Sequence, residues 1–64
     1  MPRVSEEHLE RRRQQILVAA QRCFSRKGFY NTSMQDVFAE SGLSAGAVYR
    51  YFKSKDELVA ALAS

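Results

Sequence analysis

A three-residue stretch, Gly42-Leu43-Ser44, separates two short helical segments and most limits what this chain can fold into. Residues 34–41 and residues 45–52 each place apolar side chains at helical spacing. A turn of three to four residues with a glycine between two short helices is typical of a helix-turn-helix. An ordinary bend in a small helical bundle is the alternative, and the spacing by itself favours the first without excluding the second.

Helical spacing also covers the rest of the chain, and no sustained apolar-polar alternation predicts a strand. A first helix is predicted from about Glu6 to Lys27, and a fourth helix begins after Ser54. We therefore expect an all-α fold. It is a small helical bundle with a helix-turn-helix, in which three helices arranged as in a homeodomain are followed by the start of a fourth.

Capping residues mark the predicted helix ends. Ser5 is a candidate N-cap for the first helix and Ser44 for the third. Thr32 and Ser33 are both competent caps for the second helix, and Thr32 with Gln35 has the spacing of a capping box, as has Ser54-Lys55-Asp56-Glu57 for the fourth helix. The predicted ends of the first and second helices are Gly28 and Gly42, because glycine adopts the left-handed conformation cheaply.

The chain has 64 residues, one cysteine and one histidine, so an internal disulfide is impossible and a protein metal cage is not expected. A domain this small buries little surface and usually needs extra support. The last helix shows no stop signal after Leu62, so we expect the chain to continue. Residues 1–53 are assigned to the helix-turn-helix domain, and residues 54–64 to the start of a helix that leads into a C-terminal domain.

Charge is unevenly distributed along the chain. Residues 1–27 carry seven basic and three acidic residues, and residues 28–64 carry three basic and four acidic ones. A basic end suggests an anionic partner, most often nucleic acid or a membrane surface. A solubilising face is the alternative, and charge alone does not decide.

No catalytic constellation is present, so we expect no enzyme and no cofactor. His8 and Cys23 lie fifteen residues apart on one predicted helix, about 22 Å along its axis, and cannot form a dyad. No apolar run approaches the roughly 18 residues of a membrane span, and the start does not resemble a signal peptide. The lone cysteine fits a reducing compartment, and we expect a cytoplasmic protein.

Two other binding classes remain open at this point. A membrane-surface peptide needs a strong apolar face opposite a basic one, but Glu6, Glu7 and Glu10 weaken that pattern. A small basic RNA-binding module is the better alternative. Competition between duplex DNA and folded RNA separates it from a DNA-binding domain.

The stretch GFYNTSMQDVFAESGLSAGAVYRYFKSKDEL, residues 28–58, resembles the TetR family of transcriptional regulators almost position by position. The resemblance covers roughly residues 9–62 and is most specific over residues 42–58. Two positions depart from the common pattern, because Phe38 and Ser41 stand where the family usually has alanine. A phenyl ring there is expected to tilt or space the second and third helices differently without changing the fold.

The resemblance implies a function. Members of this family are homodimers that bind a palindromic operator in double-stranded DNA and usually repress transcription. Their larger helical C-terminal domain dimerises and binds a small-molecule effector, which releases the protein from DNA. That domain would lie beyond Ser64.

The resemblance also implies the DNA-contacting residues. In a helix-turn-helix the second helix lies in the major groove, which places Ala45, Gly46 and Ala47 near the bases. Arg50 would contact a guanine or a phosphate, or only solvent. Gln35 would reach a base or close the capping box on Thr32.

The remaining implied contacts are to phosphates. Tyr49 and Tyr51 cannot share a helix face, being two residues apart. Tyr49 is expected on phosphate or base and Tyr51 on phosphate, although one of the two could pack into the core. Phosphate contacts are also implied for Lys55 and for Thr32 and Ser33, whose alternative role is capping. Arg11, Arg12 and Arg13 are expected to supply diffuse attraction, and the alternative is that they reach a neighbouring backbone or the minor groove.

Overall fold

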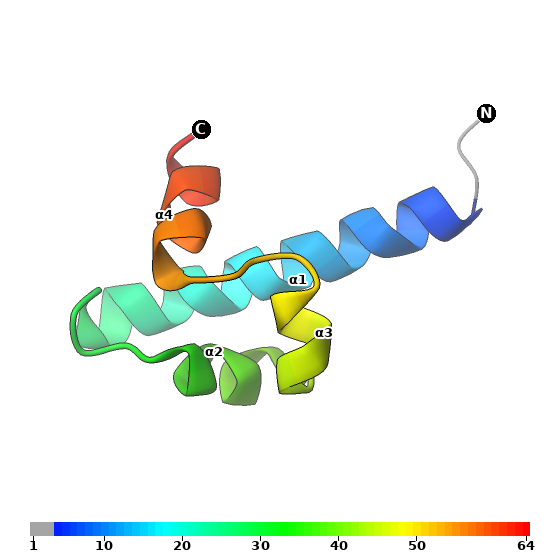
Figure 1. The fold of residues 1–64 in the computed structure, drawn as a ribbon. Helices are drawn as coiled ribbons and strands as arrows, with labels where there is room; N and C mark the ends of the chain where they lie inside the picture. The colour runs from blue at the N-terminus through cyan, green and yellow to red at the C-terminus, as the bar shows by residue number, and fades with distance from the viewer. Residues whose placement is uncertain (1–3) are drawn as a thin grey trace.

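The computed structural model describes residues 4–64 and shows one long helix against which three short helices pack (Figure 1). The helices are α1 (Val4–Lys27), α2 (Met34–Ser41), α3 (Ala45–Tyr49) and α4 (Lys55–Ala63). In this view α2 and α3 lie below α1, and most of α4 lies above it. The expected all-α class is confirmed, since no strand occurs within residues 4–64.

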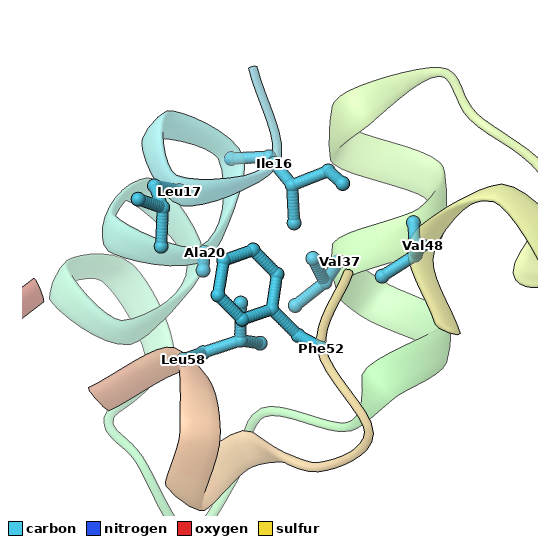
Figure 2. Close-up of a cluster of buried hydrophobic side chains, with 8 residues drawn as sticks. Ile16, Leu17, Ala20, Val37, Val48, Phe52 and Leu58 are labelled. Carbon is cyan, nitrogen blue, oxygen red and sulfur yellow. The ribbon is translucent and has the colours of Figure 1, made fainter. Parts of the chain in front are cut away.

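The core lies against the C-terminal half of α1. Each of the four helices contributes to it, and so does Phe52 in the segment after α3. Figure 2 shows the central side chains pointing toward one another. Burial of this kind stabilises a small domain by roughly 1.5–3 kcal/mol for each large side chain. The buried cluster comprises Ile16, Leu17, Ala19, Ala20, Val37, Val48, Phe52 and Leu58.

The N-terminal part of α1 extends beyond this core. Leu9, which the helical pattern places on the same face as Ile16, is 46% exposed, whereas Ile16 is fully buried. The apolar side chains at helical spacing on α4 are also only partly covered, because Leu58 is buried while Val59 and Leu62 remain exposed. Helical spacing therefore identified the apolar faces, and the arrangement of the helices decided how far each face is buried.

Two predicted helix ends differ from the structure. The first helix begins at Val4, so Ser5 lies inside its first turn and is not the N-cap. The third helix ends at Tyr49 and not at Phe52. Hydrogen-bonded turns continue it, because the N–H groups of Tyr51 and Phe52 both donate to the Val48 carbonyl oxygen, each at 3.0 Å. These turns continue to Phe52 and direct the Phe52 ring into the core.

The cap of α2 is one of the two predicted residues, but its capping box differs from the prediction. The N-cap is Ser33, and the reciprocal capping box joins Ser33 to Asp36 rather than Thr32 to Gln35. At α4 the Ser54 hydroxyl accepts the Glu57 N–H at 3.4 Å, whereas the Glu57 carboxylate accepts the backbone N–H of Lys53 and not that of the cap. Ser44 caps α3 as predicted.

Both predicted glycine turns are confirmed. Gly28 and Gly42 have φ angles of 86° and 75°, a region that residues with a Cβ rarely adopt. Polar contacts then fasten α2 to α1. The Gln15 side-chain amide donates to the Ser41 carbonyl oxygen at 2.8 Å, and Lys27 pairs with Asp36 at 3.0 Å. These contacts fix the orientation of α2 relative to α1.

Candidate nucleic-acid interface

The turn between α2 and α3 is held by short-range hydrogen bonds. The Gly42 N–H donates to the Phe38 carbonyl oxygen at 3.0 Å. The Ser41 hydroxyl donates to that same carbonyl at 3.0 Å and accepts the Leu43 N–H at 3.2 Å. Leu43 packs against the core beneath the turn. Ser41 is thus a buried turn residue, which gives a structural reason for a hydroxyl where the family usually has alanine.

The start of α3 presents a small, open surface. The Ser44 hydroxyl accepts the Ala47 N–H at 3.2 Å, while Ala45 and Gly46 are exposed and Ala47 is half-buried. A Cβ placed on Gly46 would meet no heavy atom within 4 Å, apart from its two chain neighbours and the backbone of its own helix. Packing within this chain therefore does not require glycine at this position. The surface at Gly46 is free for close approach of a partner.

The two tyrosines of this segment have different environments. Tyr49 is 40% exposed, and its ring meets the ring of Phe38 edge to face with centroids 5.3 Å apart. Tyr51 is half-buried and packs against the core. Aromatic edge-to-face contact fixes ring orientation. Phe38 of α2 thereby holds the exposed Tyr49 ring of α3 in place.

The N-terminus of α2 is organised by Ser33 and Asp36. The Ser33 hydroxyl accepts the Asp36 N–H at 3.1 Å, and the Asp36 carboxylate accepts the Ser33 N–H at 2.9 Å. That N–H, together with the Lys27 ammonium, lowers the pKa of Asp36 to about 2. Gln35 is exposed and takes no part in the box. The capping alternative for Gln35 is therefore not realised.

Thr32 is not on the surface. Its side chain is 1% exposed, and its hydroxyl donates to the carbonyl oxygens of Gly28 at 2.7 Å and Cys23 at 3.2 Å. It thereby joins the carbonyl of Gly28, which directly follows α1, to the carbonyl of Cys23 near the C-terminal end of the helix. Neither the predicted capping role nor a phosphate contact by this hydroxyl fits that position, and Ser33 is the exposed residue of the pair.

Lys55 of α4 reaches the loop between α1 and α2. Its ammonium donates to the Phe29 carbonyl oxygen at 2.7 Å and lies 4.4 Å from the centroid of the Phe29 ring. A cation over an aromatic face is attracted to the ring quadrupole. Sequence reasoning missed this link, because nothing in the local pattern relates residues that lie 26 positions apart.

The basic residues of α1 do not form one free cationic face. Arg11 pairs with Glu7 and Arg13 with Glu10 along the helix. Arg22 and Arg26 both pair with Glu40 of α2. Such surface pairs contribute little to stability, but they reduce the local field that a DNA phosphate would meet. Net charge alone therefore overstated the attraction supplied by α1.

A small surface cavity of about 130 Å³ lies between the N-terminal half of α1 and α3. Arg50, which is exposed, contributes to its lining. Sequence reasoning favoured diffuse attraction for Arg12, with contact to a neighbouring backbone or the minor groove as the alternative, and gave His8 no binding role. The full lining is His8, Leu9, Arg12, Ala47, Arg50 and Tyr51.

Within the part of the chain that the structure describes, no three His, Cys, Asp or Glu residues gather to hold a metal ion. No helix among those residues is both long and apolar enough to cross a membrane. Cys23 is fully buried, its thiol donates to the Asp36 carbonyl oxygen at 3.6 Å, and burial raises its pKa. These features give the thiol a packing role.

Comparison with known proteins identifies relatives of this arrangement. The uncharacterized HTH-type transcriptional regulator YfiR of Bacillus subtilis is 51% identical over 57 residues, which are 89% of this chain and 28% of YfiR. The HTH-type transcriptional repressor Rv1474c of Mycobacterium tuberculosis is 44% identical over 63 residues, 98% of this chain and 34% of that protein. The HTH-type transcriptional regulator TtgR of Pseudomonas putida is 39% identical over 62 residues, 97% of this chain and 30% of TtgR.

The chain spans about a third of the length of these relatives. No solved structure matches it significantly. A family model described as bacterial regulatory proteins of the tetR family matches residues 16–62, which include the helix-turn-helix and most of α4. The chain therefore belongs to the tetR family of bacterial regulatory proteins, and its helices include the helix-turn-helix of that family.

Proposed function

We propose that this chain binds an operator in double-stranded DNA by placing α3 in the major groove, and that it acts as a transcriptional repressor in the cytoplasm. The observation that carries the proposal is the open surface at the start of α3. Ala45 and Gly46 are exposed on a helix that Gly42 and Ser44 hold at a fixed angle to α2. Small side chains there admit close approach of a base-pair edge.

Around this surface lie the groups that would hold DNA. Tyr49 on α3 and Arg50, the residue after α3, are exposed and carry donor groups, and Ser33 and Gln35 lie at the start of α2. Contacts to phosphate position such a helix, and contacts to bases give it specificity. Since alanine cannot hydrogen-bond to a base, Ala45 and Ala47 would read only thymine methyl groups or exclude bulk. The proposed contact residues are Ser33, Gln35, Ala45, Gly46, Ala47, Tyr49, Arg50, Tyr51 and Lys55.

The palindromic operator, the homodimer and the small-molecule effector are further parts of this proposal. Named repressors among the relatives support the repressor role. Two copies would place two α3 helices in successive major grooves, about 34–36 Å apart. The exposed Val59 and Leu62 of α4 offer apolar area that a further domain could cover.

The test is selection of a duplex from a random-sequence pool, followed by titration of the selected duplex at increasing salt. If three to five phosphates are neutralised per chain, the logarithm of the association constant should fall against that of salt with a slope of about −3 to −5. Folded RNA and anionic vesicles serve as competitors. An affinity that does not change with salt, or displacement of DNA by folded RNA, would overturn the proposal.

A further inference from the structure

The cavity between α1 and α3 brings together basic side chains from distant parts of the chain. His8 and Arg12 come from the N-terminal half of α1, and Arg50 comes from the residue that follows α3. The remaining lining residues, Leu9, Ala47 and Tyr51, give the cavity partly apolar walls, which strengthen charge interactions beside them. The volume of the cavity is about 130 Å³.

Arg12 differs from both of its neighbours in its ion pairing. Arg11 has Glu7 at 3.7 Å and Arg13 has Glu10 at 3.8 Å, whereas Arg12 donates to the neutral side-chain oxygen of Gln15 at 3.3 Å. Within residues 4–64 neither Arg12 nor Arg50 has a carboxylate within 4.0 Å. No acidic residue lines the cavity. The two arginines that line the cavity thus have no carboxylate partner among the described residues.

We propose that this cavity binds one phosphate of the DNA backbone, with the guanidinium groups of Arg12 and Arg50 as its main ligands. Planar guanidinium groups match phosphate oxygens in geometry and remain charged at all relevant pH values. His8 supplies a further donor, which imidazole offers in either protonation state. The proposal rests on the proposed DNA-binding function and assigns Arg50 to phosphate rather than to guanine.

One consequence is that α1 contributes to the interface through a single charged residue beside α3. Arg11, one position earlier, is paired with Glu7 and does not line the cavity. The two arginines therefore provide a matched comparison, since the same substitution removes the same charge from adjacent positions on one helix. A diffuse field would respond equally to both, and a built phosphate site would not.

The experiment measures the affinity of the protein for a selected duplex over a range of salt concentrations. Arg12→Gln is expected to weaken binding by about tenfold and to reduce the magnitude of the salt slope by about 1. Arg11→Gln is expected to change both quantities much less. Arg50→Gln should lower the affinity for selected and random duplexes alike. The double variant with Arg12→Gln and Arg50→Gln should lose less binding free energy than the sum of the two single variants. Circular dichroism melts verify that each variant is folded.

A second measurement locates the phosphate. Neutral methylphosphonate groups replace single phosphates of the selected duplex, one position at a time. At one position the wild-type protein should lose affinity while Arg12→Gln loses none, because the variant no longer contacts that phosphate. Titration with inorganic phosphate, followed by NMR of the arginine side chains, tests a free anion as the alternative source.

Equal effects of Arg11→Gln and Arg12→Gln on a wild-type protein that does bind DNA would overturn the phosphate site and leave the proposed function intact. Loss of discrimination at one base pair in Arg50→Gln would overturn the assignment of Arg50. Saturable binding of inorganic phosphate, with no duplex position at which methylphosphonate lowers affinity, would show that the cavity binds a free anion and not a DNA phosphate. A wild-type protein that binds no duplex would overturn the proposed function itself.

Discussion

The ring of Phe38 on α2 meets the ring of Tyr49 on α3 edge to face, with centroids 5.3 Å apart and planes inclined by 73°. This contact joins the two helices of the helix-turn-helix at a position where the family usually has alanine. Phe38 in place of the usual alanine therefore adds a contact between α2 and α3. It also orients a ring that remains 40% exposed on the proposed DNA-binding surface.

Tyr49→Phe should separate packing from DNA binding. The ring contact with Phe38 is kept, so the melting temperature should stay near that of the wild type. The lost hydroxyl removes one hydrogen bond to DNA, so operator affinity should fall by about 1.5–3 kcal/mol if its partner is a phosphate. Thermal melts and anisotropy titrations measure the two effects. A lower melting temperature with unchanged affinity would make Tyr49 a packing residue only.

Phe38→Leu should lower the free energy of unfolding by about 1 kcal/mol, because the aromatic pair is lost while apolar volume is largely kept. In a Tyr49→Leu background the same change should cost less, since the partner ring is already gone. Urea unfolding of the four proteins of this cycle gives the coupling energy. Equal costs in both backgrounds would show that the ring contact contributes nothing.

Lys55→Met should destabilise the fold by about 1 kcal/mol, because it removes the charged donor of the Phe29 carbonyl, which keeps only the Thr32 N–H at 3.3 Å, and removes the cation from the Phe29 ring. Lys53→Met is the control, since it removes a hydrogen bond of equal length to the Tyr49 carbonyl on an exposed surface. It should cost less. If urea unfolding shows that Lys55→Met leaves stability unchanged, the contacts of Lys55 with Phe29 contribute nothing to the fold.

Acid should weaken the fold through Asp36. The Ser33 N–H and Lys27 hold the pKa of Asp36 at about 2, below the roughly 3.9 of an unfolded chain. The stabilisation is therefore complete above pH ~4 and is lost as pH falls toward ~2. Urea unfolding across this range should show a smaller acid loss in Asp36→Asn than in the wild type. Asp56→Asn, in the first turn of α4, is the control and should retain the wild-type profile.

Cys23 should react only when the chain opens. The side chain is fully buried and burial raises the pKa of its thiol, so little thiolate forms at neutral pH and reagents cannot reach it. Labelling by an aromatic disulfide reagent should be slow in buffer and should accelerate with urea in step with unfolding. Labelling in buffer at the rate of a free cysteine would contradict the buried position.

The sequence by itself determined the local features of this fold. Gly28 and Gly42 end helices because only the residue without a Cβ takes a positive φ cheaply, and that preference acts within a few residues. The caps at Ser44 and Ser54 follow from the same kind of local hydrogen bonding. Apolar residues at helical spacing likewise mark the faces that contain Ile16 and Leu58, both of which are buried.

Only the tertiary structure decided between side chains that are equivalent locally. Thr32 and Ser33 are both good caps, but the carbonyls at the end of α1 take the Thr32 hydroxyl and leave the cap to Ser33. Arg12 follows Arg11 in a uniform basic run, yet only Arg12 lines the cavity beside α3. Such choices depend on groups that lie far away in the sequence, and the packing of α1 against the other helices sets which of them are within reach.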